Sequence, residues 1–174
     1  MPNRSGVAFS LIMLLSPEAL VQTSNAKDRP NDEAAIKRVI AQYDEFWNRH
    51  EFGRTAELRT EDSENVNILG LRETREDIAK GGPPYYQQVF GNSTLHNTVI
   101  SIKFIKSDVA AVDSTWEMTG MKCPDGSDVS YRRGLMNLVM TKDRGRWLIA
   151  VFHNLDLPAP AERSGQGSVP CQFR

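Results

Sequence analysis

The sequence predicts an α+β fold in which about three helices pack on one face of a curved antiparallel sheet. Three observations carry this prediction: apolar residues recur at helical spacing near residues 31–50, the spacing changes to alternation after Gly91, and short turns separate the alternating segments. A helical period gathers apolar residues on one stripe, whereas alternation gathers them on one face of a strand. Helices first and a meander afterwards are typical of α+β domains.

The first helix is predicted to begin at Asn31 or Asp32 and to end by about His50. The side chain of Asn31 or Asp32 can accept hydrogen bonds from the first free backbone N–H groups of the helix. An acidic residue also suits the positive end of the helix dipole. Apolar residues then recur every three or four positions and form one stripe. Its members are Ile36, Val39, Ile40, Tyr43, Phe46 and Trp47.

Shorter elements are predicted between this helix and the sheet. Glycines and prolines at 81–84 interrupt the helical pattern, because neither residue type continues a helix well. The expected elements are helices over 55–58, 73–80 and 85–90 and a short strand over 64–69.

Four strands are expected in the second half of the chain, where turn sequences separate alternating segments. The strongest turn signal is Cys123-Pro124-Asp125-Gly126. The resulting antiparallel meander has strands over 96–104, 112–119, 131–141 and 147–154.

The two ends of the chain differ from the core in composition. Arg4 precedes an apolar run over 7–15, which is far shorter than the roughly 20 residues needed to span a bilayer. Ser24-Asn25-Ala26 offers small residues at the spacing of a signal-peptidase site. Export to the periplasm or the medium is therefore expected, and a frayed helix or a membrane-lying segment is the alternative. The predicted organisation is a signal peptide over 1–26, one domain over 27–157 and an irregular tail over 158–174.

Composition excludes several classes of function. The 21 Lys and Arg against 22 Asp and Glu leave a net charge of -1, so no basic excess is present to bind nucleic acid. Three His and two Cys do not supply a zinc framework. The P-loop, G-x-S-x-G and H-E-x-x-H motifs are missing from the sequence. We therefore expect no cofactor, no metal, no nucleic-acid partner and no stable membrane insertion.

The two cysteines, Cys123 and Cys171, have neither metal-ligand spacing nor a histidine neighbour. In an oxidising compartment an even number of thiols usually pairs, and a bond would fix the tail across the predicted hairpin. In the cytoplasm the same thiols would stay free. Both alternatives remain open at this point.

Six short motifs, in order over about residues 32–155, resemble the SnoaL-like proteins of the nuclear-transport-factor-2-like superfamily. The closing run Gly145-Arg146-Trp147-Leu148-Ile149-Ala150-Val151-Phe152-His153-Asn154 is the most specific, and it is similar to the branch labelled SgcJ/EcaC. The other five are Trp47-Asn48, Asn67-Ile68-Leu69-Gly70, Thr74-Arg75-Glu76-Asp77-Ile78, Asp108-Val109-Ala110 leading to Trp116-Glu117-Met118-Thr119-Gly120, and Arg132-Arg133-Gly134.

The resemblance implies a cone-shaped fold, a pocket between the helices and the concave sheet, and frequent homodimers. Relatives isomerise ketosteroids, close polyketide rings, open epoxides or only bind ligands. The sequence departs from the family pattern at Glu73, where an aromatic residue and a glycine often stand, and at Gly81-Gly82-Pro83, where many relatives place a histidine. A mechanism with a second histidine in the pocket is therefore not supported.

Three residues are predicted to carry the chemistry. His153 is the candidate acid or base because an unperturbed histidine titrates near about 6.5, and a core histidine is the alternative. Asn67 could donate a hydrogen bond to a carbonyl or enolate oxygen, and a turn residue is the alternative. Asp113 would be the natural carboxylate base if its strand face turned inward; a solvated face is the alternative.

The predicted substrate-binding residues are aromatic or cationic. Tyr43 and Trp47 lie four positions apart on the helical stripe, where core packing is the other role open to them. Trp116 lies either under the helices or on the outer face of the sheet, where a homodimer interface is expected. Arg133 could hold an anionic group if it faces inward, and a surface arginine is the alternative.

These residues predict an exported domain that binds a small, largely apolar carbonyl compound of polyketide type. If it is an enzyme, it is a cofactor-independent isomerase, cyclase or lyase, with His153 as acid or base and Asn67 or Tyr43 orienting the oxygen. A non-catalytic ligand-binding or dimerisation module is the alternative. Polar groups that converge within about 3 Å of one vacant point would favour the enzyme.

Overall fold

The computed structural model describes residues 29–158 and Cys171, so the predicted signal peptide lies outside the described residues. The elements occur in an order that begins with helices and ends with the long strands. They are α1 (Arg29–Asn48), the 3-10 helix η1 (Phe52–Leu58), β1 (Arg59–Val66), β2 (Arg72–Thr74), α2 (Arg75–Ala79), α3 (Tyr86–Phe90), β3 (Thr94–Phe104), β4 (Val109–Thr119), β5 (Met121–Lys122), β6 (Asp128–Val129), β7 (Arg132–Asp143) and β8 (Arg146–Leu157).

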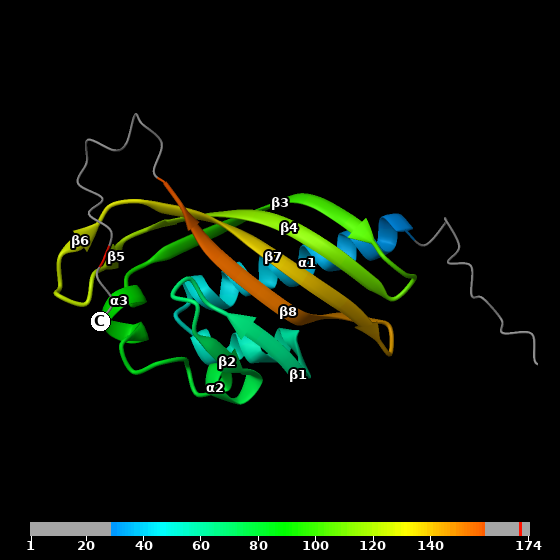
Figure 1. Ribbon diagram of the computed structural model, residues 1–174, viewed down its shortest axis with the longest axis horizontal. Helices are drawn as coiled ribbons and strands as arrows, with labels where there is room; N and C mark the ends of the chain where they lie inside the picture. Colours follow the sequence, from blue (N-terminus) through cyan, green and yellow to red (C-terminus); the bar gives the residue numbers. More distant parts are fainter. Residues whose placement is uncertain (1–28, 159–170, 172–174) are drawn as a thin grey trace, which may run out of the picture.

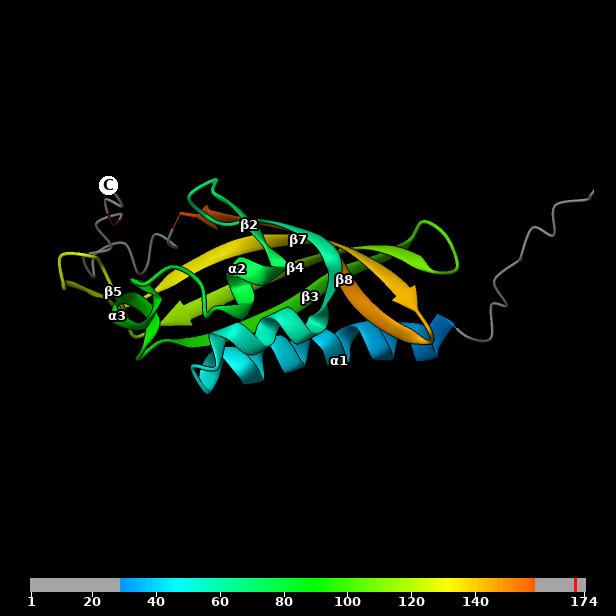
Figure 2. The ribbon, with the colours of Figure 1, turned by 90° about the horizontal axis from the view of Figure 1, so that it is seen from below.

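A curved six-stranded sheet forms the body of the molecule, with α1 lying along its concave side (Figures 1 and 2). The strand order is β2-β1-β8-β7-β4-β3, the sheet is not closed, and β5 and β6 form a separate two-stranded hairpin. The predicted α+β class and the four-strand meander β3-β4-β7-β8 are confirmed.

The apolar stripe of α1 packs against the sheet as its spacing predicts. Ile36, Ile40 and Phe46 are all at most 2% exposed. Full burial of such a side chain contributes about 1.5–3 kcal/mol. The chain is already helical at Arg29, the first described residue of α1, so neither Asn31 nor Asp32 is the first residue of the helix as predicted. The Asp32 carboxylate instead accepts hydrogen bonds from Lys142 Nζ at 2.7 Å and Trp147 Nε1 at 2.9 Å, joining α1 to β7 and β8.

Asp32→Ala is expected to lower the free energy of unfolding by about 2 kcal/mol at neutral pH, because it leaves the Trp147 N–H without its acceptor. Burial acts to raise the pKa of Asp32, but the hydrogen bonds from Lys142 and Trp147 outweigh it and lower the pKa. The contribution of Asp32 to stability is therefore present above pH 3.8, its pKa in the unfolded chain. It is lost as the pH falls through the lower pKa of Asp32 in the folded protein. Chemical denaturation should show the difference from wild type shrinking in acid. Glu33→Ala on the same turn is the control, and an equal loss in both variants would contradict this role.

The strand that follows η1 differs from the prediction. It covers residues 59–66 rather than 64–69, and it pairs in parallel with β8 and antiparallel with β2. Its buried side chains are polar, so the alternation of apolar residues that signals a strand is missing from the sequence. The helix predicted over 73–80 is also shorter, because Thr74 caps α2 through a capping box with Asp77.

The concave face of the sheet carries the apolar side chains of its central strands. Trp116 and Met118 lie on this face, 4% and 6% exposed, and not on the outer face considered for a homodimer. The hairpin beyond them is joined to the tail by a disulfide between Cys123 and Cys171, with a Cα–Cα distance of 5.2 Å. The two cysteines therefore form a disulfide, which decides between the two alternatives left open by the sequence, and the predicted turn at Cys123–Gly126 is confirmed.

Candidate functional site

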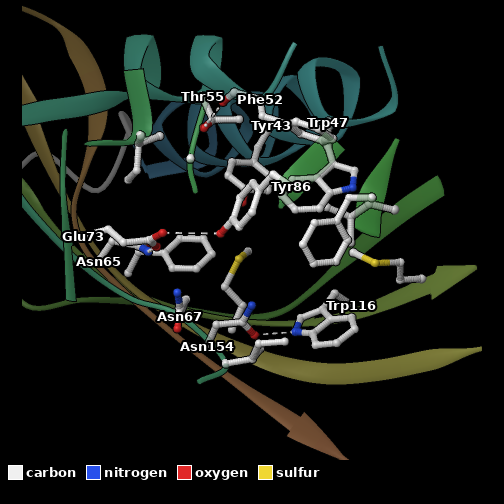
Figure 3. A pocket seen from close by; sticks show the side chains of 18 of the residues that line it. Tyr43, Trp47, Phe52, Thr55, Asn65, Asn67, Glu73, Tyr86, Trp116 and Asn154 are labelled. Carbon is white, nitrogen blue, oxygen red and sulfur yellow. Dashed lines mark hydrogen bonds between the residues drawn. The ribbon is translucent and has the colours of Figure 1, made fainter. Parts of the chain in front are cut away.

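A pocket of about 80 Å³ lies between the helices and the concave face of the sheet, where the resemblance placed it (Figure 3). One water needs roughly 10–15 Å³ measured in the same way, so the pocket has room for several waters or a small ligand. Its walls are mainly apolar and aromatic. The apolar lining includes Phe52, Ile68, Ile78, Phe90, Leu95, Met118, Met136 and Phe152.

A polar cluster occupies one wall of this pocket, with a carboxylate at its centre. We call it the Glu73 cluster, and it consists of Arg59, Asn65, Asn67, Glu73 and Tyr86. The Glu73 carboxylate accepts hydrogen bonds from Asn65 Nδ2 at 2.5 Å and from the Tyr86 hydroxyl at 3.5 Å. The Asn67 side chain, just after β1, also acts to lower the pKa of this carboxyl group. Asn65 comes from β1, Tyr86 from α3 and the carboxylate from β2.

Burial raises the pKa of Glu73, although the hydrogen bond from Asn65, the Asn67 side chain and the charge of Arg59 act in the opposite direction. A carboxylate with a raised pKa is a stronger base than an ordinary glutamate. The hydroxyl beside it stays neutral, because burial and the Glu73 charge raise the pKa of Tyr86. The arrangement therefore provides a base in a largely apolar pocket, next to a neutral hydroxyl.

Two further polar groups lie on other walls of the pocket. Trp116 Nε1 donates to Asn154 Oδ1 at 2.6 Å. Because an indole N–H only donates, this bond leaves the Asn154 Nδ2 amide free to donate to a ligand. Burial raises the pKa of Tyr43 to about 12, so its hydroxyl is a neutral donor. Within the described part of the chain, that hydroxyl makes no hydrogen bond.

Four of the seven predicted site residues line the pocket: Tyr43, Trp47, Asn67 and Trp116. Trp47 also packs in the core, and its Nε1 donates to Ser93 Oγ at 3.0 Å. Asn67 has the turn role considered for it, and its side chain also lines the pocket. Its Oδ1 accepts the backbone N–H groups of Leu69 and Leu71, at 2.9 and 3.1 Å, so its amide is the part that meets Glu73.

The prediction that His153 enters the pocket is wrong. Its side chain is 52% exposed on the outer face, with Nε2 3.8 Å from Glu64 Oε1, and Asn154 takes the inward place. The physical reason is a bulge in β8 between Ile149 and Val151. A one-residue shift exchanges the two faces of a strand, so Phe152 faces inward and its neighbour outward.

Asp113 and Arg133 also lie outside the pocket, which corrects their predicted roles there. Asp113 faces outward and accepts hydrogen bonds from Ser101 Oγ at 3.0 Å and Asn137 Nδ2 at 2.6 Å. Arg133 Nε donates to the Pro158 carbonyl at 2.7 Å. The alternation along β7 brings Arg132 to the pocket instead, where it pairs with Asp156.

The sequence interpretation missed Glu73, Asn65, Arg59, Tyr86 and Asn154 as functional candidates. One signal was available, since Glu73 stands where the family pattern differs. The described residues contain no cluster of three or more His, Cys, Asp or Glu side chains suited to a metal ion. No helix among the same residues has the length and apolar character required to cross a membrane.

No family model matches the sequence, and no curated protein matches it. Solved structures do. An uncharacterized protein with a cystatin-like fold from Caulobacter vibrioides is 21% identical over 80% of this chain and 97% of its own, with a TM-score of 0.65. A hexachlorocyclohexane dehydrochlorinase is 13% identical over 78% of this chain and 93% of its own, with a TM-score of 0.65. A ketosteroid isomerase-like protein from Erwinia carotovora atroseptica is 17% identical over 72% of this chain and 96% of its own, with a TM-score of 0.58.

At these identities the likeness establishes the fold. The chain has a cystatin-like fold, and its solved structural neighbours include an NTF-2 like protein from Shewanella oneidensis. A shared fold does not transfer a reaction, so the function is argued from the pocket.

Proposed function

We propose that this protein binds a small, largely apolar carbonyl compound and transfers a proton on it, with Glu73 as the acid–base group. The observation that carries the proposal is the Glu73 carboxylate, whose pKa burial raises, facing an apolar pocket that also contains neutral donors. The reaction type is that of a cofactor-independent isomerase, cyclase or lyase. The assignment to the SgcJ/EcaC branch is a finer proposal that rests on the run Gly145 to Asn154.

The first step removes a proton from the carbon beside the carbonyl group. The Glu73 carboxylate takes the proton, and the C–H electron pair moves into an enolate whose charge lies on oxygen. The Tyr43 hydroxyl and the Asn154 amide are the donors available to that oxygen. The protonated Glu73 then returns the proton to another carbon, which isomerises the compound. In a cyclase or a lyase the enolate instead attacks a second carbonyl or expels a leaving group.

The structural neighbours support this class of reaction. The names of two neighbours denote a dehydrochlorinase and a ketosteroid isomerase-like protein, and the same proton transfer would serve elimination and isomerisation.

Nitrobenzisoxazole is a suitable first probe, because a carboxylate base opens its ring by taking one C–H proton and releases a coloured phenolate. Wild-type protein should open this ring. Ligand-induced thermal stabilisation without any turnover would instead support a binding module.

Tyr43→Phe is expected to lower the rate on a carbonyl substrate about 100-fold, because it removes one donor to the enolate oxygen and keeps the ring. Proton exchange beside a carbonyl, followed by NMR in deuterated water, measures this rate. His153→Ala is the matched control, and its rate should stay within twofold of wild type because the side chain lies outside the pocket. Loss of activity in the histidine variant with a normal Tyr43 variant would contradict the assignment.

Export and assembly remain proposals. The Cys123–Cys171 disulfide supports export, because disulfides persist mainly in oxidising compartments. A homodimer through the outer face of the sheet is supported by apolar side chains there, among them Leu155, which is 49% exposed. A stable dimer would bury at least about 1,000 Å² in total. Light scattering at micromolar concentration should give twice the chain mass, and the mass of one chain would contradict the dimer.

A further inference from the structure

Arg59 is a buried cation at the start of β1, beside the Glu73 cluster's carboxylate. The residue is 4% exposed, and its guanidinium lies 4.8 Å from the centre of the Phe152 ring. Nη2 donates to Asn65 Oδ1 at 3.2 Å, whereas Nε and Nη1 are buried without a hydrogen-bond partner among the described residues. Burying a charge with so few partners is destabilising, so a packing role does not account for this arginine.

We propose that Arg59 is a positioning residue whose guanidinium holds Asn65 in the one amide orientation that serves Glu73. The same guanidinium supplies the positive charge that balances the Glu73 carboxylate. The inference rests on the proposed function, because it assigns how the proposed base is held and charged. Arg59 need not touch the substrate, since its unpaired nitrogens are covered in the pocket wall.

The orientation of Asn65 follows from the chemistry of its two neighbours. A guanidinium can only donate, so it requires the amide oxygen of Asn65 to face it. The amide nitrogen then points the other way and donates to Glu73 Oε2 at 2.5 Å. Without Arg59, the amide could rotate and present its oxygen to the carboxylate, which would repel it. One planar cation therefore fixes a chain of two hydrogen bonds.

The charge balance follows from the groups that face Glu73. Beside Arg59 of β1, the titratable groups around the carboxylate are Tyr86 of α3, Tyr85 just before that helix and Tyr43 of α1, all kept neutral by burial. The other cation of the pocket wall, Arg132 of β7, is paired with Asp156. Arg59 is thus the cation whose charge lowers the pKa of Glu73 within the described residues.

Two substitutions separate the charge from the planar hydrogen bond. Arg59→Met keeps much of the length and removes both. Arg59→Lys keeps the charge and removes the fixed bond to Asn65. Arg49→Met is the control, because Arg49 is exposed and pairs with Glu45 on α1. The readouts are the carboxyl-carbon NMR titration of Glu73 in each folded protein and the pH dependence of nitrobenzisoxazole opening.

Arg59→Met should move the Glu73 titration midpoint upward by at least about one pH unit, which corresponds to a tenfold change in the proton equilibrium. The midpoint of the rate profile should move with it, and Arg49→Met should leave both in place. Arg59→Lys should keep the midpoint near wild type and lower the maximal rate about tenfold, because the amide of Asn65 is no longer oriented.

A Glu73 midpoint that is unchanged in Arg59→Met would overturn the inference. If that variant does not fold, a Lys variant with an unchanged maximal rate overturns it equally. The proposed function fails separately, because the NMR titration does not depend on turnover. A shifted Glu73 midpoint in a protein that opens no ring would support the role of Arg59 and reject Glu73 as a catalytic base.

Discussion

Glu73→Gln is expected to reduce proton transfer at least about 100-fold and, at neutral pH, to raise the unfolding temperature. Glutamine keeps the size of the side chain and can still accept a hydrogen bond from Asn65, but it cannot take a proton from carbon. The stability gain follows from the raised pKa of Glu73, since burial favours the neutral form. The resulting stabilisation of the folded protein is fully present below pH 4.5, the pKa of Glu73 in the unfolded chain. It is lost as the pH rises through the higher pKa of Glu73 in the folded protein.

Thermal unfolding of both proteins at neutral pH and below pH 4.5 measures this effect. The two unfolding temperatures should converge in acid, because the wild-type carboxyl group is then also neutral. Glu64→Gln is the matched control, since Glu64 is 46% exposed and pairs with Arg72 outside the pocket. A Glu73 variant with normal activity and lower stability would show that this carboxylate has a structural role only.

Gly134→Ala is expected to lower the free energy of unfolding by about 3 kcal/mol and to abolish ligand binding. A Cβ atom at Gly134 would lie 2.2 Å from the Leu155 carbonyl oxygen and 2.2 Å from Cε2 of Trp116. Either β7 must separate from β8, or the indole must leave the pocket wall. The second movement would break the hydrogen bond between Trp116 and Asn154.

Chemical denaturation and tryptophan fluorescence measure the two effects of this substitution. Gly126→Ala is the control, because its Cβ meets nothing within 4 Å and only its φ of +86° opposes alanine. That strain should cost about 1 kcal/mol and leave the pocket intact. If Gly134→Ala loses no more stability than the control, the close packing of β7 against Trp116 is not a determinant of the site.

The parts of the fold that could be predicted from the sequence are those in which apolar residues set the pattern. The stripe of α1 and the alternation along β3, β4, β7 and β8 placed these elements within a few residues. The position of β1 could not be predicted in this way, because Arg59, Ser63 and Asn65 are its buried residues. Its parallel pairing with β8 depends on contacts far apart in the sequence, for which local patterns contain no signal.

The candidate site was predicted less completely than the fold, for two physical reasons. Strand alternation shows that His153 and Asn154 face opposite ways, but the bulge near Ile149 decides which of them faces inward. The Glu73 cluster is assembled from β1, the turn after it, β2 and α3, and its polar residues resemble solvated ones in the sequence. Tyr43, Trp47 and Trp116 line the pocket as predicted, because the apolar core fixes α1 and β4.

The pH dependence of nitrobenzisoxazole opening by the wild-type protein tests the central claim most directly. If the Glu73 carboxylate is the base, the rate should rise with pH through a single ionisation whose midpoint lies above 4.5, the ordinary glutamate value. Only the ionised form can accept the proton, and burial moves that ionisation upward. The same profile measured with Glu73→Gln should lose this ionisation. A profile that keeps the same midpoint in the Gln variant would contradict the assignment of Glu73 as the base.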